Sequence, residues 1–131
     1  FIQRYFDFYK GVNEWQQRIK QNGINETRTI LGRRRIWSDK PKVTEILNSP
    51  IQGTAADIIK EALVMLMKEI ENTDYKIVGS VHDEIILEVP ERRAEWAATT
   101  LTSIMVQAGS KYLKSIPVIV DARIANNWSE K

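Results

Sequence analysis

The sequence predicts an α+β fold in which a small antiparallel sheet is covered by two long helices. Residues 76–89 contain two runs rich in Val and Ile around a short polar interruption, the pattern of a β-hairpin. Apolar residues recur at helical spacing over residues 58–70 and 94–112. A further β-branched run between Pro117 and Ile124 predicts a C-terminal strand that completes the sheet. Strands and helices in this order are typical of helices packed on a sheet.

The N-terminal region is predicted to be helical from Ile2 to about Asn22, because its apolar residues follow helical spacing. Glycine disfavours a helix interior by about 1 kcal/mol relative to alanine, so we expect a kink or break near residues 10–11. Gly23 fits the left-handed position that often ends a helix.

A short basic hairpin is expected next, with residues 26–31 as one strand, a turn at Gly32 and residues 33–37 as the other. Between Arg28 and Lys42 six basic residues face one acid, which gives this segment +5 in a chain of net charge +2. Such a local concentration indicates contact with a polyanion, and a solvated loop is the alternative.

The first long helix carries a start signal at Ser49, where Pro50 would occupy the first turn and Gln52 would close a capping box. A second possible start lies at Thr54. Residues 72–74, Asn-Thr-Asp, are expected to end this helix.

Composition sets further bounds on function. With 131 residues, 43% of them apolar, the chain is long enough for one domain with its own core. It has no cysteine, which excludes disulfides and thiolate metal sites and favours a reducing compartment. No apolar run approaches the ~20 residues needed to cross a bilayer, so no membrane partner is expected. The chain begins at Phe1 without methionine, and we therefore expect it to be part of a longer protein.

The polar interruption of the 76–89 hairpin consists of His82, Asp83 and Glu84. Favoured two-residue turns need positive φ and therefore usually contain glycine or asparagine, which are missing here. A carboxylate in their place indicates a functional role, and an ordinary solvated turn is the alternative. His82 is the only histidine, which excludes histidine-cluster metal sites, and close neighbours on one strand cannot converge as a catalytic triad.

Neighbouring strand residues point to opposite faces, so Asp83 and Glu84 cannot both bind one ion squarely. Carboxylate oxygens suit Mg²⁺, which is often bound by one or two carboxylates plus substrate phosphates. Two-metal phosphoryl or nucleotidyl transfer, with ions ~3.5–4 Å apart, would need a second carboxylate from another strand. Asp121 lies on a predicted strand but has no accompanying motif, so the site is expected to be incomplete.

Several segments resemble the family A (bacterial polymerase I type) DNA polymerases. Residues 81–84, Val-His-Asp-Glu between apolar strands, resemble motif C of that family. Residues 48–60 are similar to its Asn-Ala-Pro-Met-Gln-Gly-Thr-Ala-Ala-Asp-Ile-Ile-Lys segment. Residues 26–27 with 32–34 resemble its Glu-Thr and Gly-Arg-Arg turn, and 127–128 its closing Asn-Trp. The resemblance covers nearly the whole chain.

This resemblance implies catalytic roles at the hairpin. Asp83 would bind the catalytic Mg²⁺ ions, and Glu84 would be a supporting carboxylate beside it. His82 would lie near the primer 3′ end. Asn48 and Gln52 match residues that touch the duplex near the primer terminus, where amides can donate to minor-groove acceptors shared by all base pairs.

The basic segment would bind the template side. Arg33 and Arg34 match residues that support the template backbone, with salt bridges inside the turn as the alternative. The stretch between Arg35 and Asn48 is shorter and less arginine-rich than is usual in the family. Lys40 and Lys42 are expected to compensate as further DNA contacts.

The same resemblance makes residues 1–24 the tail of the fingers subdomain and residues 25–131 the C-terminal part of the palm. Motif A, with the other metal-binding aspartate, and motif B, which grips the incoming nucleotide, would lie in a missing N-terminal segment. The complete enzyme would transfer nucleotides from a dNTP to a primer 3′-OH on a DNA primer–template, in the cytoplasm at the nucleoid or, if phage-encoded, in the host cytoplasm. The isolated chain is expected to be inactive, because one metal-binding strand cannot build the site.

Two alternatives from other classes stay open. One is a non-catalytic nucleic-acid-binding module derived from a polymerase palm, which salt-dependent duplex binding without activity would favour. The other is a structural domain whose apolar surface needs a second chain, which self-association in sedimentation would reveal.

Overall fold

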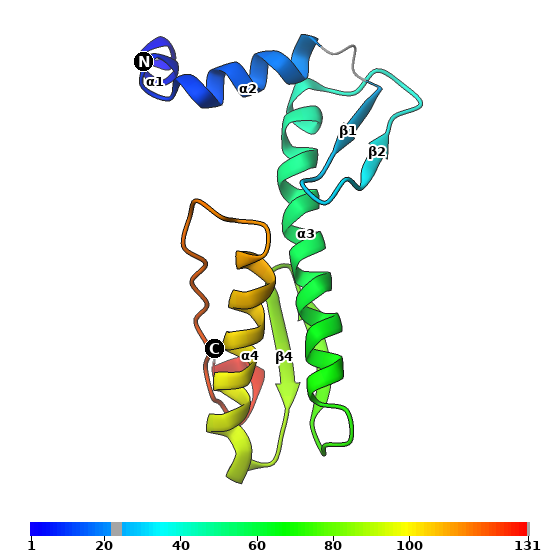
Figure 1. Cartoon of the computed structure of the whole chain (residues 1–131), viewed down its shortest axis with the longest axis vertical. Helices are drawn as coiled ribbons and strands as arrows, with labels where there is room; N and C mark the ends of the chain where they lie inside the picture. The colour runs from blue at the N-terminus through cyan, green and yellow to red at the C-terminus, as the bar shows by residue number, and fades with distance from the viewer. Residues whose placement is uncertain (22–24, 131) are drawn as a thin grey trace. The chain divides into compact units, whose positions relative to one another are not determined.

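The computed structural model describes residues 1–21 and 25–130 and confirms the α+β class (Figure 1). Its two sheets are both antiparallel and two-stranded. The chain divides into two compact units, the first ending at Thr54 and the second beginning at Ala55. None of the helices in the described part of the chain has the length and apolarity that spanning a bilayer requires. In chain order the elements are α1 (Ile2–Phe8), α2 (Lys10–Gln21), β1 (Glu26–Arg28), β2 (Arg34–Ile36), α3 (Val43–Glu69), β3 (Lys76–Val81), β4 (Glu84–Glu88), the 3₁₀ turn η1 (Glu91–Arg93), α4 (Ala94–Ser110) and the 3₁₀ turn η2 (Trp128–Glu130).

The predicted break in the N-terminal helix is confirmed, one residue earlier than expected. It falls at Tyr9, whose φ of −98° and ψ of 61° interrupt the helix between α1 and α2. Gly11 lies inside the first turn of α2. The proposed helix end at Gly23 and the proposed subdomain boundary after residue 24 involve positions outside the described residues.

The basic hairpin forms as predicted, although its strands are shorter than the sequence suggested. β1 and β2 pair with Glu26 opposite Ile36 and Arg28 opposite Arg34. Gly32 in the turn has a φ of +87°, a conformation that glycine adopts without steric cost.

The predicted start of the first long helix was wrong. α3 begins at Val43, so Ser49 and Thr54 do not cap it and Pro50 lies inside it. The earlier start is stabilised by Glu45, whose Oε2 accepts a hydrogen bond from the backbone N–H of Lys42 at 2.8 Å. This bond satisfies one of the donors that a helix leaves unpaired at its first turn.

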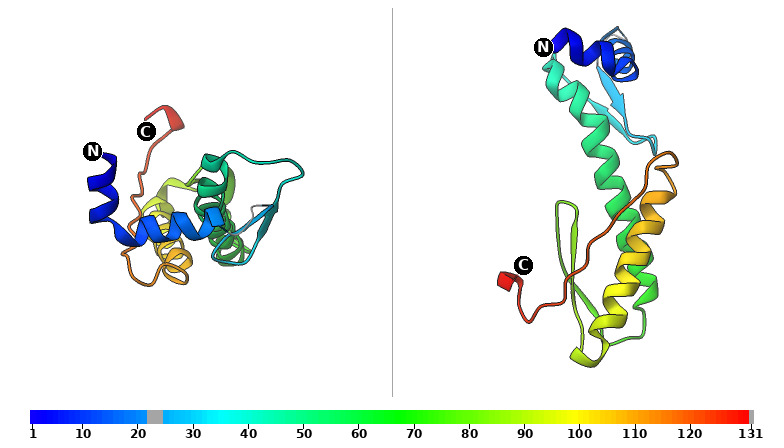
Figure 2. Two further views of the ribbon diagram at one scale, coloured as in Figure 1. Left: turned by 90° about the horizontal axis from the view of Figure 1, so that it is seen from above. Right: turned by 90° about the vertical axis from the view of Figure 1, so that its left-hand side faces the viewer.

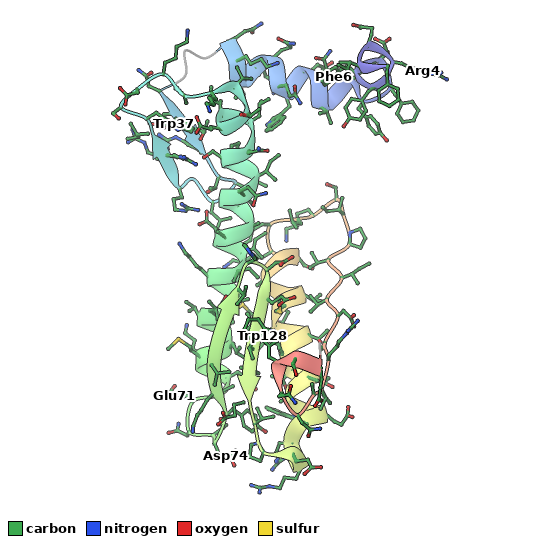
Figure 3. All side chains as sticks on the ribbon, turned by 180° about the vertical axis from the view of Figure 1, so that it is seen from behind. Arg4, Phe6, Trp37, Glu71, Asp74 and Trp128 are labelled. Atoms are coloured by element: carbon green, nitrogen blue, oxygen red, sulfur yellow. The ribbon has the colours of Figure 1, made fainter. Side chains whose placement is uncertain are left out.

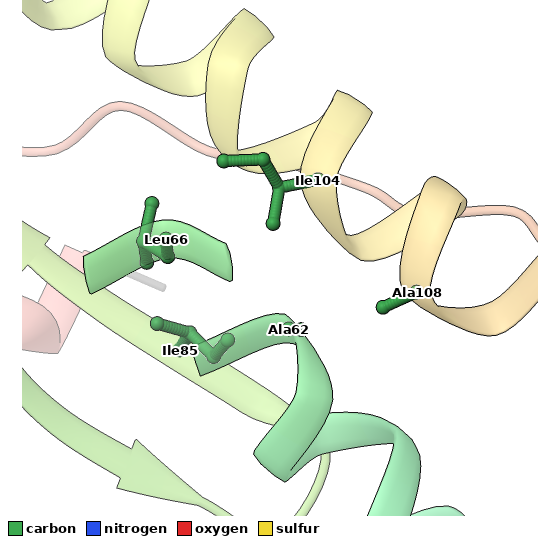
Figure 4. Close-up of a cluster of buried hydrophobic side chains, with 5 residues drawn as sticks. All are labelled: Ala62, Leu66, Ile85, Ile104 and Ala108. Carbon is green, nitrogen blue, oxygen red and sulfur yellow. The ribbon is translucent and has the colours of Figure 1, made fainter. Parts of the chain in front are cut away.

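The core of the second unit lies between α3, α4 and the β3–β4 hairpin, which confirms that two long helices pack on the hairpin. Leu66 is the one large side chain that is fully buried among the described residues. The buried cluster in Figure 4 takes two residues from α3, one from β4 and two from α4: Ala62, Leu66, Ile85, Ile104 and Ala108. The predicted apolar faces of α3 and α4 thus supply four of the five buried residues.

The β3–β4 hairpin contains an irregularity in its register. Ile77 pairs with Leu87, but the next paired residues are Gly79 and Ile86, which leaves Val78 as an extra residue on β3. This is a β-bulge, a feature that bends its strand and increases its twist.

The predicted C-terminal strand is wrong. Residues 117–124 have no regular secondary structure, and no described strand pairs with them. The segment instead runs back along α4, as Figures 1 and 2 show, and the side chain of Val118 lies against Gly109. β-branched residues favour a strand only where a neighbouring strand completes the ladder, and the second unit supplies none at this position.

Candidate active site and nucleic-acid interface

The tip of the β3–β4 hairpin is a two-residue turn. Val81 and Glu84 are the last paired residues, so His82 and Asp83 alone connect the strands. His82 has a φ of +54°, whereas Asp83 is not among the residues with positive φ. Positive φ at the first turn residue alone is the pattern that normally requires glycine. A histidine held there is a local strain of the kind found at functional sites.

The side chains at this tip differ in their surroundings. His82 and Asp83 are exposed, and within residues 25–130 neither makes a hydrogen bond or ion pair. Glu84 is half-buried and follows the turn on β4, on the face opposite the buried Ile85. The carboxylate of Asp83 is therefore open to a ligand from solvent.

The described residues do not by themselves form a complete metal site. No group of three or more His, Cys, Asp or Glu side chains with ligand geometry occurs among residues 1–21 and 25–130. Asp121, the other strand carboxylate considered from sequence, is exposed in the segment after α4. An exposed carboxylate at a rigid turn still fits Mg²⁺, which accepts one or two protein carboxylates with water and phosphate oxygens. The Asp83 carboxylate is thus a suitable type of ligand for Mg²⁺, but a complete site needs a further protein ligand.

Asn48 and Gln52 lie one turn apart in the first part of α3, and both are exposed. Residues four apart on a helix share a face, so the two amides point to the same side. The alternative role of Gln52 in a capping box is wrong, because α3 begins at Val43. The amide pair remains a predicted duplex contact.

Arg34 is part of an ion-pair network within the basic hairpin. Its Nε donates to Oε2 of Glu26 at 2.7 Å, and Nε of Arg28 donates to Oε1 at 2.7 Å. The hydrogen bond from Arg34 and the positive charges of both arginines hold the pKa of Glu26 below its ordinary value of 4.5. The salt bridge considered for Arg34 is therefore present. About half of the Arg34 side chain remains exposed, so the network does not bury its charge.

The other predicted basic contacts also lie in the first unit. Nη2 of Arg33 donates to the carbonyl of Gly53 at 3.0 Å, which ties the hairpin to α3. Lys40 and Lys42 are exposed in the loop before α3. All four basic residues thus lie on the hairpin or directly after it, while their contact with DNA stays a prediction.

Sequence reasoning missed two features of this region. The hydroxyl of Thr54 accepts a hydrogen bond from the backbone N–H of Ile30 at 3.1 Å, across 24 residues of sequence. The guanidinium of Arg35 lies 5.1 Å from the ring centroid of Trp37, a cation–π contact beside β2 (Trp37 is labelled in Figure 3). In the sequence, only Gly53 and the neighbouring Thr54 indicated that another element packs closely against this helix.

Comparison with known proteins gives one consistent result. A family model described as DNA polymerase family A matches residues 1–130. The thermostable DNA polymerase I of Thermus filiformis is 34% identical over 141 residues, covering 99% of this chain and 17% of that protein. DNA polymerase I of Aquifex aeolicus is 34% identical over 134 residues, covering 98% of this chain and 23% of that protein.

A solved structure agrees with these relatives. It is the POL domain of Pol1 from M. smegmatis in complex with DNA primer-template and dNTP, which matches with a TM-score of 0.71 and 31% identity over 82% of this chain and 21% of that chain. This chain therefore spans about a fifth of the length of the proteins it matches. With the family model matched along residues 1–130, the chain belongs to DNA polymerase family A.

Proposed function

We propose that this chain is the part of a DNA-directed DNA polymerase that supplies one metal-binding carboxylate and part of the DNA-binding surface. The reaction of the complete enzyme is template-directed nucleotidyl transfer from a dNTP to a primer 3′-OH. The observation that carries the proposal is the exposed carboxylate of Asp83, held at a strained two-residue turn in a chain of this family. Positioning and electrostatics dominate phosphoryl-transfer catalysis, so a rigidly placed carboxylate is what the reaction needs.

At the tip, Asp83 would hold Mg²⁺ and Glu84 would support it from the start of β4. When bound, Mg²⁺ would supply positive charge that stabilises the negative charge developing during nucleotidyl transfer. His82, fixed by the turn, lies beside the primer 3′ end, where its imidazole can donate a hydrogen bond to the primer backbone. The two-residue turn leaves the backbone of His82 and Asp83 little freedom relative to the strands.

The proposed partners are a DNA primer–template, a dNTP and an upstream polymerase segment. The first two are supported by the likeness to the POL domain solved with DNA primer-template and dNTP. The upstream segment would carry motif A, with the second aspartate, and motif B, with the nucleotide-gripping helix. The complete enzyme would work in the cytoplasm at the nucleoid, or in the host cytoplasm if phage-encoded.

Primer extension tests the proposal. The isolated chain is expected to give no extension, whereas the chain combined with an upstream segment carrying motifs A and B is expected to extend the primer in the presence of Mg²⁺. Asp83→Asn should then lower the rate at least about a hundredfold, the scale of losing a group that stabilises transition-state charge. Asp121→Asn is the matched control, because it removes an exposed carboxylate outside the hairpin. Equal rates for Asp83→Asn and the unsubstituted chain would overturn the assignment.

A non-catalytic nucleic-acid-binding module is the second candidate. It is favoured by the concentration of the basic hairpin and the Asn48–Gln52 amide pair in the first unit, separate from the β3–β4 hairpin. Duplex binding that weakens steeply with salt, without extension even after the upstream segment is added, would select this candidate.

A further inference from the structure

The β1–β2 hairpin is joined to α3 by a small contact, here called the hairpin–helix junction and defined as Thr29, Arg33, Gly53 and Thr54, of which the two threonines are buried. We propose that this junction positions the basic hairpin and the Asn48–Gln52 amide pair as one DNA-binding surface. The inference rests on the proposed function, because it concerns how the duplex contacts of this chain are held in place. All four residues belong to the first unit.

The hairpin approaches α3 closely at Gly53. A Cβ atom at this position would lie 2.7 Å from Cγ2 of Thr29 and 3.3 Å from Nη2 of Arg33. Carbon atoms make favourable contact at about 3.5–4 Å, so even one methyl group would push the hairpin away from the helix. Gly53 is therefore required by the packing of the two elements.

Hydrogen bonds also hold the β1–β2 hairpin against α3. Thr54 accepts from the backbone N–H of Ile30 at 3.1 Å and donates to the carbonyl of Pro50 at 2.6 Å. Thr29 accepts from the backbone N–H of Arg33 at 3.1 Å within the turn. Thr29 and Thr54 are 8% and 7% exposed, so water cannot easily replace these partners. The junction thus has one well-defined geometry.

The junction connects two kinds of DNA contact. The hairpin from Glu26 to Ile36 holds four arginines against one glutamate, a net charge of +3 suited to phosphates. Gln52 directly precedes Gly53 and lies on the same exposed face of α3 as Asn48. The side-chain amides of Asn48 and Gln52 are suited to contacts with base edges. Both kinds of contact can be made to one duplex only if their separation is fixed. Thr29, Gly53 and Thr54 are therefore positioning residues.

Compensating substitutions test this directly. Gly53→Ala adds the methyl group that meets Cγ2 of Thr29, while Thr29→Ser removes Cγ2 and keeps the hydroxyl that accepts from Arg33. The affinity of the full chain for a primer–template duplex is measured by fluorescence anisotropy over a range of salt concentrations. Gly53→Ala should weaken binding at least about tenfold and lower the salt slope by about one or two phosphate contacts. The double variant Gly53→Ala with Thr29→Ser should return to within about threefold of the unsubstituted chain.

A second pair of variants addresses the hydrogen bonds. Thr54→Val keeps the shape but cannot accept from Ile30, and Thr54→Ser restores the hydroxyl. We expect weaker duplex binding for the valine variant and normal binding for the serine variant. Circular dichroism and thermal melting show which variants are folded at the assay temperature, so that affinity is compared only between folded chains.

The outcomes separate this inference from the function on which it rests. If the unsubstituted chain shows no salt-dependent duplex binding, the proposed DNA-binding surface is wrong and the junction has no such role. If the unsubstituted chain binds but folded Gly53→Ala binds equally well with the same salt slope, the DNA-binding surface stands and the positioning role is overturned. Loss of binding that Thr29→Ser does not repair would also overturn it, since the contact at Cγ2 would not be the cause.

Discussion

Val81 lies directly opposite Glu84 across the β3–β4 hairpin, so the strands remain paired up to the turn itself. His82 and Asp83 consequently have no loop to absorb their conformation. The positive φ of His82 is imposed by the pairing on either side, and the exposed imidazole and carboxylate are presented from a rigid base.

Replacing His82 by glycine should stabilise the chain and impair the enzyme. A left-handed conformation costs a residue with a Cβ about 1–2 kcal/mol, and glycine avoids this cost. Glycine also loses more conformational entropy on folding, which offsets about 0.5–1 kcal/mol of the gain. We expect the free energy of unfolding in urea to rise by about 0.5–1 kcal/mol, while primer extension with the upstream segment falls. Asp83→Gly is the control, since its φ is not positive and glycine gains nothing there. Equal stability changes for the two variants would contradict the strain at His82.

Leu66→Ala should destabilise the second unit strongly. Leu66 is fully buried at the centre of the cluster formed by α3, α4 and β4. Truncating a buried leucine typically costs about 2–5 kcal/mol, because it removes apolar contacts and leaves a cavity. Val64→Ala, an exposed position on the same helix, should cost less than about 0.5 kcal/mol. Urea unfolding followed by circular dichroism measures both, and similar costs would refute this placement of the core.

Gly109→Ala should release the segment that follows α4. An added Cβ would lie 2.8 and 3.0 Å from the two methyl carbons of Val118. Overpacking of this kind costs about 1–3 kcal/mol, which raises the population of the detached segment at least about fivefold. Limited proteolysis within residues 116–126 should accelerate accordingly. Gly11→Ala, with no atom within 4 Å of its added Cβ, should leave the cleavage rate unchanged.

The basic hairpin should contribute to acid sensitivity through Glu26. The hydrogen bond from Arg34 lowers the pKa of Glu26 below 4.5, so its ionised form is favoured in the folded chain. The resulting stability is fully present above pH 4.5 and is lost as pH falls through the lowered folded-state pKa. As pH falls below 4.5, the Glu26→Gln variant should therefore lose less stability than the unsubstituted chain. The same is expected of the Arg34→Met variant. Thermal melting against pH tests this, and parallel curves for all three chains would contradict it.

The sequence was sufficient to predict elements whose signals are local. The β3–β4 hairpin forms where two β-branched runs flank a short polar turn, and the β1–β2 hairpin forms around Gly32. The apolar spacing over residues 94–112 produces α4 with its buried face. The start of α3 was misplaced because Pro50 is favoured at a first turn, yet the contact between Glu45 and Lys42 begins the helix seven residues earlier.

Other features depend on contacts that no local pattern contains. The run from Pro117 to Ile124 has strand propensity but no partner among the described strands. The bond between Ile30 and Thr54 joins residues 24 positions apart, and its existence follows from how the hairpin lies on α3. The roles of Asp83 and Gln52 stay predictions, because a ligand site is identified by what occupies it as well as by the side chains that face it.

The extra residue at Val78 has a consequence for how such hairpins are recognised. A bulge turns the strand beyond it, so the direction in which Asp83 points is set several residues before the turn, by β3. A protein with the same four tip residues on an unbulged strand would aim its aspartate elsewhere. To identify hairpins with this geometry from sequence, the spacing of the preceding strand should therefore be matched along with the four tip residues.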